Sequence, residues 1–174
     1  MNIFVTDPSP YVSAQVLPDK HVVKMPLETC QMLSIVCSDK WGHSYGQLHR
    51  INGEPYKTEK GAFRNHPCTV WANQSLINTW WLVAHGIGLC EEYTHRYGKW
   101  HGAMKHIDAL DYGRKMIPEG WQTPHPQCFS GLDHLKTDEQ YPIKAYRAFY
   151  IADKARFARY RYTQQPTWMK GVAL

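Results

Sequence analysis

DKHVVKMPLETCQMLSIV, at residues 19–36, decides the fold, because it combines an apolar stripe with one polar face. Asp19 is a residue type that caps helix starts, and the apolar residues after it recur at helical spacing. Pro26 removes an internal hydrogen bond and is expected to bend the helix. We therefore predict a helix over residues 19–36 that packs its apolar face into a core. The apolar residues of the predicted helix are Val22, Val23, Leu27, Met32, Leu33 and Val36.

Helical patterns continue on both sides of this stretch, whereas the alternation typical of strands is rare. Proline and glycine punctuate the chain between the helical patterns. Helices are predicted at residues 9–16, from Asn65 or His66 to about Tyr97, at 99–112 and at 141–162. Residues 38–66 and 113–130 are predicted to be long loops.

Length and composition favour one folded unit. The chain has 174 residues and a mass of 20.2 kDa, which is the size of a single domain. Hydrophobic residues make up 43%, enough for a core, and no repeat or linker divides the chain. We predict an all-α fold, a compact single-domain helical bundle with long loops that spans residues 1–174.

The sequence shows no sign of membrane insertion or of a disulfide framework. No stretch approaches the roughly 18 uncharged apolar residues of a membrane span, and residues 1–16 lack the features of a signal peptide. The five cysteines are an odd, widely spaced set, which favours reduced thiols. A cytoplasmic protein without a membrane partner is therefore predicted.

The net charge of +5 is concentrated near the C-terminus. Between Lys144 and Lys170 the chain carries seven basic residues and one acid, a local +6 that leaves −1 elsewhere. Aromatic residues alternate with these cations, a combination that suits a phosphate backbone and an exposed base. The alternative is a solvated helix whose aromatic side chains belong to the core. The candidate DNA-binding residues of this basic-aromatic segment, residues 141–174, are Lys144, Arg147, Lys154, Arg161, Trp168 and Lys170. The first four share helical spacing.

The polar face of residues 19–36 is the candidate catalytic site. His21, Lys24, Glu28 and Gln31 lie at i, i+3, i+7 and i+10, so one side of a helix carries them. A carboxylate, an imidazole and an amine together can perform acid–base or Schiff-base chemistry. An ordinary amphipathic helix with a polar outer face remains the alternative.

Other chemistries find little support in the sequence. It contains no CxxC or HExxH pair, and His66 with Cys68 is an isolated pair, so no metal site is predicted. Glycine-rich phosphate loops and the GxSxG elbow are also absent. We therefore expect no cofactor.

Three stretches resemble the pyrimidine-dimer DNA glycosylase/AP-lyase family known from phages. Asp19 and His21 followed by Glu28 resemble the family's D-x-H-x6-E helix, in which the glutamate is catalytic. HPCTVW at residues 66–71, with the long helix after it, resembles the entry into the family's central helix. PTWMK at residues 166–170 resembles a motif near the family's C-terminus. The stretches follow the family's order and helical context.

The resemblance implies a helical enzyme that acts on a damaged or modified pyrimidine in duplex DNA with an extruded base. An amine would attack C1′, and a Schiff base would then allow strand cleavage. Glu28 would be the catalytic carboxylate, supported by His21, and His66 with the C-terminal segment would contact DNA. A phage origin would place the protein in the host cytoplasm.

The chain differs from the family pattern at the nucleophile. The family uses the α-amine of a small second residue, whereas residue 2 here is Asn2, and Met1 is expected to be retained. Arginines that flank the family's glutamate correspond to Leu27 and Gln31. Lys24, one turn before Glu28, is an alternative amine. Two other functions therefore stay open: a transferase acting on hydroxymethylated pyrimidine on the same scaffold, and a non-catalytic DNA-binding accessory protein.

Overall fold

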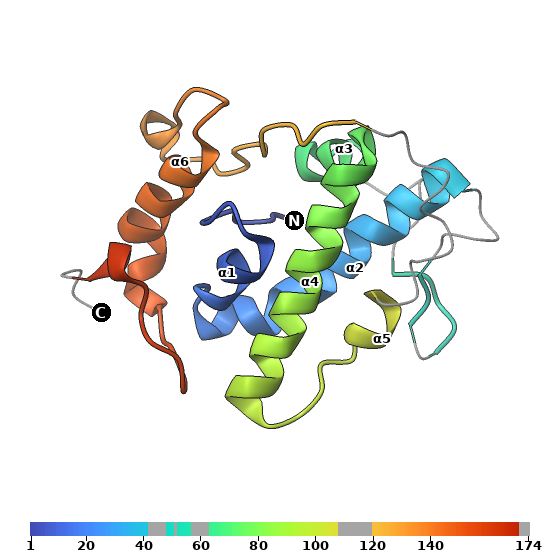
Figure 1. Cartoon of the computed structure of the whole chain (residues 1–174), viewed down its shortest axis with the longest axis horizontal. Helices are drawn as coiled ribbons and strands as arrows, with labels where there is room; N and C mark the ends of the chain where they lie inside the picture. The colour runs from blue at the N-terminus through green and yellow to red at the C-terminus, as the bar shows by residue number, and fades with distance from the viewer. Residues whose placement is uncertain (42–47, 51, 57–62, 108–119, 171–174) are drawn as a thin grey trace.

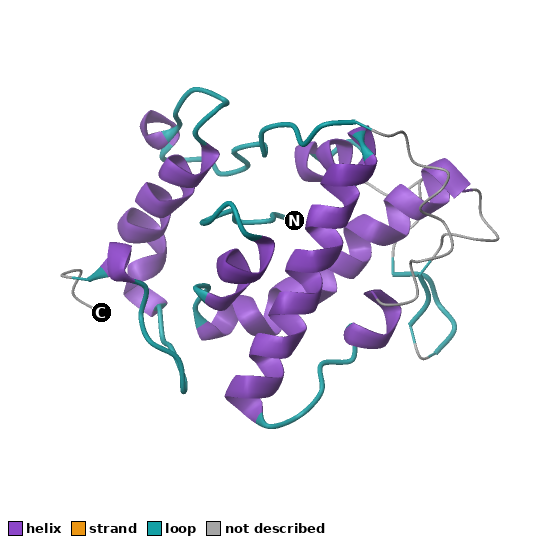
Figure 2. Cartoon of the chain, viewed as in Figure 1, coloured by secondary structure: helices purple, strands orange, loops and turns teal. Residues whose placement is uncertain are grey.

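Two helices that cross one another form the centre of the molecule. The computed structural model describes residues 1–41, 48–50, 52–56, 63–107 and 120–170. Within these ranges the ordered elements are helices, and the pairing of His49 with Pro55 is an isolated bridge (Figure 2). Helix α4 (Leu76–Tyr97) packs against α1 (Pro10–Gln15) and α2 (Asp19–Trp41), as Figure 1 shows. The predicted all-α fold class is confirmed.

Two glycines of α4 allow its close packing. A Cβ on Gly86 would lie 2.6 Å from Cγ2 of Thr29 on α2. A Cβ on Gly88 would lie 3.1 Å from Cβ of Ala14 on α1. These residues lower intrinsic helix propensity, but they let both neighbouring helices approach the α4 backbone. The buried apolar side chains of the three helices form one core with Ile3 and Val5.

The helix predicted from residue 65 or 66 to residue 97 is two helices. α3 (Pro67–Gln74) ends at Ser75, whose φ of −152° and ψ of 157° are those of extended backbone. The Ser75 hydroxyl accepts a hydrogen bond from the Asn78 N–H at 3.2 Å and caps α4. The single long helix was therefore a wrong prediction, because a serine can end one helix and begin the next. α5 (Met104–Ile107) is shorter than the helix predicted at 99–112, of which residues 108–112 lie outside the described part.

The helix predicted at residues 141–162 also ends early. α6 (Pro142–Phe149) continues as a π-helical turn at Tyr150–Lys154 and a 3₁₀ turn at Ala155–Phe157. The chain then pairs with the start of α2: Asp19 N–H donates to Arg159 O at 2.8 Å, and the Asp19 carboxylate accepts the Arg161 N–H at 3.0 Å. Because Arg161 lies outside the helix, the prediction that it shares a helical face with Lys144 is wrong.

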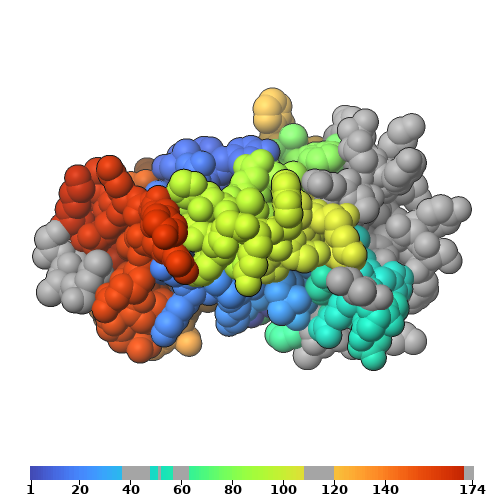
Figure 3. Space-filling model, turned by 90° about the horizontal axis from the view of Figure 1, so that it is seen from below, coloured from blue at the N-terminus to red at the C-terminus, as the bar shows by residue number. Residues whose placement is uncertain are grey.

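The C-terminal segment covers one end of the molecule, beside α2 and α4 (Figure 3). Arg96 of α4 is buried there, and its guanidinium donates to Glu92 at 2.7 Å and to Asp19 at 2.8 Å. Thr163 donates its hydroxyl proton to the same Glu92 oxygen at 2.7 Å.

None of the described helices is both long and apolar enough to cross a membrane.

Candidate active site

A pocket of about 620 Å³ opens where the N-terminus meets α2 and the C-terminal segment. Its volume is in the range of pockets that hold small ligands. α2 contributes His21, Lys24 and Glu28, and the π-helical turn contributes Lys154. Met1, Asn2, Asp153 and the loop at 128–132 are also part of the lining. The structure thus brings the three predicted catalytic residues into one cavity.

Glu28 is the most enclosed acidic side chain of this pocket. Its Oε2 accepts a hydrogen bond from the Asn2 backbone N–H at 3.0 Å and lies 3.9 Å from the α-amine of Met1. Its other oxygen, Oε1, forms an ion pair with Nζ of Lys24 at 3.0 Å. The Lys24 side chain is 68% exposed, whereas that of Glu28 is 11% exposed. One buried carboxylate therefore lies beside two primary amines, and either amine could form a Schiff base.

The Asn2 side chain holds the start of the chain in place. Its Oδ1 accepts hydrogen bonds from the backbone N–H groups of Ile3 at 2.8 Å and Phe4 at 3.1 Å, and from the Tyr146 hydroxyl at 2.7 Å. Its Nδ2 donates to Cys128 O at 2.7 Å. Asparagine at position 2 therefore fixes the N-terminal backbone against Glu28. Sequence reasoning treated Asn2 only as a departure from the family pattern.

His21 is held inside the wall of the pocket. Its ring stacks on Phe4 with 4.6 Å between ring centroids, and Nδ1 lies 2.5 Å from the Tyr150 hydroxyl. Burial, with the charges of Lys154 and Lys24, lowers the pKa of His21 to about 3. The imidazole is consequently neutral at physiological pH. Its contacts with Phe4 and Tyr150 connect α2 to the N-terminal segment and to the π-helical turn.

The predicted DNA-binding residues separate into two groups. Arg147 donates to Thr6 O at 2.8 Å, pairs with Asp7 at 3.4 Å and lies over the half-buried Trp168 ring, 5.6 Å from its centroid. Arg147 thus holds the N-terminal segment, and Trp168 packs against the Arg147 guanidinium. Lys154 lines the pocket, while Lys144, Arg161 and Lys170 are exposed. The aromatic residues of α6 are largely core, as the alternative interpretation expected.

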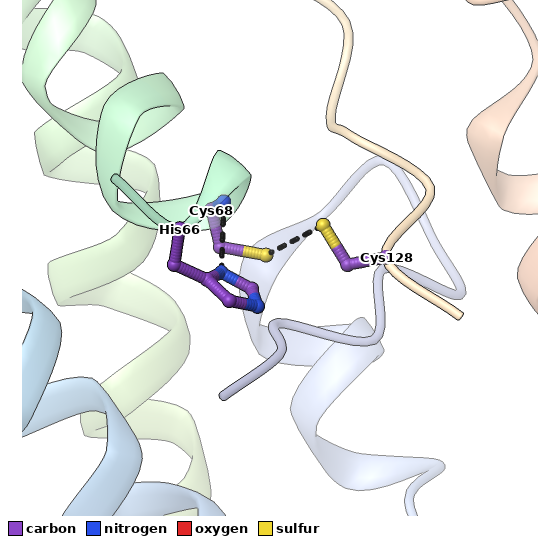
Figure 4. A group of neighbouring side chains, drawn as sticks. All are labelled: His66, Cys68 and Cys128. Carbon is purple, nitrogen blue, oxygen red and sulfur yellow. Dashed lines mark hydrogen bonds between the residues drawn. The ribbon is translucent and has the colours of Figure 1, made fainter. Parts of the chain in front are cut away.

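His66 lies outside this pocket, in a neighbouring cluster shown in Figure 4. It caps α3, because Nδ1 accepts the Cys68 N–H at 3.2 Å. Sγ of Cys68 is 3.5 Å from Sγ of Cys128, which belongs to the segment 120–130. The prediction that His66 and Cys68 form an isolated pair is therefore wrong. Cys128 is 60 residues from Cys68 in the sequence, so a local spacing motif could not predict the contact. None of the four cysteines whose side chains are described forms a disulfide.

Comparison with known proteins supports the resemblance seen in the sequence. Neither a curated protein nor a solved structure matches the chain. The family model described as pyrimidine dimer DNA glycosylase matches residues 1–105, which include α1, α2, α3, α4 and Glu28. Because this match spans more than half of the 174 residues, the chain belongs to the pyrimidine dimer DNA glycosylase family.

Proposed function

We propose that the protein is a DNA glycosylase with AP-lyase activity, acting on a damaged or modified pyrimidine in duplex DNA with Glu28 as its catalytic carboxylate. Family membership supports a glycosylase-like function on DNA in general. The observation that carries the finer proposal is the contact of Glu28 with the Asn2 backbone nitrogen at 3.0 Å and with the Met1 amine at 3.9 Å. A nucleophile and a carboxylate are thus within reach of one substrate atom.

The reaction begins with attack of the amine on C1′ of the target nucleotide. A nitrogen–carbon bond forms, the glycosidic bond breaks, and its electron pair leaves with the base, which takes up a proton. The C1′–O4′ bond then breaks, O4′ takes up the proton that the attacking nitrogen loses, and a Schiff base results. Loss of a C2′ proton to solvent eliminates the 3′ phosphate. Glu28 stabilises the positive charge that develops at C1′, where a buried carboxylate acts more strongly than an exposed one.

We propose the α-amine at the start of the chain as the nucleophile. Asn2 and Tyr146 hold the backbone beside this amine, whereas the Lys24 side chain is largely exposed and has more freedom. If Met1 is removed, the amine of Asn2 takes the position now 3.0 Å from Glu28. Lys24 then serves as the ion partner of Glu28 at 3.0 Å. Either form of the N-terminus thus presents an amine to the same carboxylate.

The remaining pocket residues have supporting roles in this proposal. His21, neutral and held by Phe4 and Tyr150, is a positioning residue for α2. Lys154, which lines the pocket and pairs with Asp153 at 2.7 Å, contacts phosphate, and exposed Lys144, Arg161 and Lys170 extend the cationic surface for DNA. Extrusion of the base costs a few kcal/mol, and less at a damaged or mismatched pair. The pocket accordingly favours lesions that are already weakly paired.

Borohydride trapping on irradiated and on hydroxymethylated duplex DNA tests the proposal. We expect a covalent adduct and released base, with the adduct mapping to the N-terminal peptide. An adduct on Lys24 would reassign the nucleophile and leave the glycosylase proposal standing. A base of altered mass in intact strands would instead indicate the transferase. Salt-sensitive binding without either product would indicate the accessory protein.

A further inference from the structure

We propose that His66, Cys68 and Cys128 form a binding site for a soft divalent cation, with Zn²⁺ as its expected ligand. The three side chains come from the start of α3 and from the segment 120–130, and Figure 4 shows the two cysteines pointing toward one another. One donor atom from each residue lies within 4.8 Å of the other two. The cluster adjoins the Glu28 pocket, which Cys128 also lines, but none of the three side chains has a role in the proposed reaction.

The spacing of the two sulfurs fits tetrahedral coordination. Zinc–sulfur bonds of about 2.3 Å at a tetrahedral angle put two sulfurs about 3.8 Å apart. Sγ of Cys68 and Sγ of Cys128 are 3.5 Å apart, so a change of a few tenths of an ångström would admit the ion. The two cysteines therefore need no backbone rearrangement to act as ligands.

Both cysteines are held in place by residues that are not ligands. The hydroxyl of Tyr146 accepts the Cys128 N–H at 2.9 Å, and Asn2 Nδ2 donates to Cys128 O at 2.7 Å. Cys68 is fully buried in the first turn of α3, directly after Pro67. A ligand set that is ordered before the metal arrives loses little conformational freedom on binding.

The chemistry of the donors selects the ion. Two sulfurs and an imidazole favour Zn²⁺ over the hard cations Mg²⁺ and Ca²⁺, which prefer oxygen. Binding replaces the thiol protons with metal–sulfur bonds, and these protons pass to solvent. Coordination through Nδ1 of His66 displaces its 3.2 Å cap bond. Coordination through Nε2 moves the ring proton to Nδ1, which then no longer accepts the Cys68 N–H. Three protein ligands leave the fourth coordination position of the ion for water. This position faces a groove beside the cluster, which His66 and Cys128 line.

Titration of the reduced, metal-free full chain with Co²⁺ tests this site, because thiolate ligands give cobalt a characteristic charge-transfer absorption. We expect one equivalent to bind and Zn²⁺ to displace it. C128S should weaken Co²⁺ binding by about 100-fold or more. H66N keeps a helix-capping side chain and removes the imidazole, so it should weaken binding while α3 stays folded. C30S, at a buried thiol elsewhere in the core, is the matched control and should bind as the parent does.

Three results would overturn the proposal. The first is the absence of a charge-transfer band in the reduced chain. The second is equal Co²⁺ affinity in C128S and C30S. The third is a protein that oxidises to a Cys68–Cys128 disulfide, two hydrogens lighter by mass, and takes up no metal after reduction. That result would assign the pair to redox chemistry. Circular dichroism of every variant shows whether a loss of binding reflects a loss of fold.

Discussion

The N-terminal part of the pocket and the C-terminal segment contribute different things to the same cavity. Residues 1–28 supply the amine, the carboxylate and the neutral imidazole. The segment from α6 onward supplies Tyr146 and Tyr150. Their hydroxyls form hydrogen bonds with Asn2 and His21, respectively. The sequence pattern predicted one region for chemistry and the other for DNA. In the structure, buried side chains of the C-terminal segment hold the N-terminal part of the pocket in place.

This difference shows that charge and position along the chain do not by themselves define a binding surface. Arg147 and Lys144 are three residues apart on α6, yet Arg147 bonds to the N-terminal segment while Lys144 is exposed. Cations that point inward stabilise the site, and cations that point outward remain available to phosphate. Substitutions in the two regions should therefore affect different measurements.

E28Q should have the largest effect. Loss of the negative charge removes stabilisation of the sugar cation, and we expect excision to fall by about 10³-fold or more while DNA affinity changes little. Single-turnover base release and a binding titration measure the two effects. The control E91Q alters an exposed carboxylate of α4 and should leave both unchanged. Full excision by E28Q would refute the catalytic assignment.

R147A and K144A separate packing from DNA contact on α6. R147A removes the bond to Thr6 O and the ion pair with Asp7, so we expect unfolding in urea to become easier by about 1–2 kcal/mol. The N-terminal segment should also loosen and excision should slow. K144A should keep the stability of the parent and lose a little DNA affinity. Equal stability of the two variants would show that Arg147 does not support the site.

Acid should destabilise the protein through its buried histidines. Burial lowers the pKa of His85 and of His125 to about 3, and both side chains have a ring nitrogen without a hydrogen-bond partner. Because these folded-state pKa values lie below 6.5, the unfolded chain binds more protons between pH 6.5 and 3. Stability is therefore complete above pH 6.5 and is lost as the pH falls, by about 1 kcal/mol per pH unit for each histidine. Urea unfolding at a series of pH values measures this slope, and H85L should reduce it. The same slope in H85L would point to other groups.

K154A should have the smallest effect. Lys154 lines the pocket, where its Nζ pairs with Asp153 at 2.7 Å, so its loss should weaken DNA binding a few-fold and lower the salt slope by about one counterion. R161A removes a cation that lies over the Tyr97 and Tyr162 rings, and it tests whether the DNA surface extends that far from the pocket. An unchanged salt slope in K154A would place the DNA on another face.

Some of the site was predictable from local pattern. The polar face of α2 carries His21, Lys24 and Glu28, and helical periodicity alone places these side chains on one side. The contact of Asn2 with Glu28 was not predictable, because a bond across 26 residues depends on how the N-terminal segment packs. The break at Ser75 and the early end of α6 were also not predicted from the sequence. A helix cap at the first position and a tertiary hydrogen bond at the second override helix propensity.

By itself, the sequence determined that the protein is helical, that α2 carries one polar face and that its motifs resemble those of a DNA glycosylase family. Those properties follow from periodicity and from short motifs, which act over a few turns. Tertiary structure alone decided that the N-terminal amine lies beside Glu28, that Arg147 points inward and that Cys128 meets Cys68. Each of these contacts joins residues far apart in the chain, and long-range packing determines which partners meet.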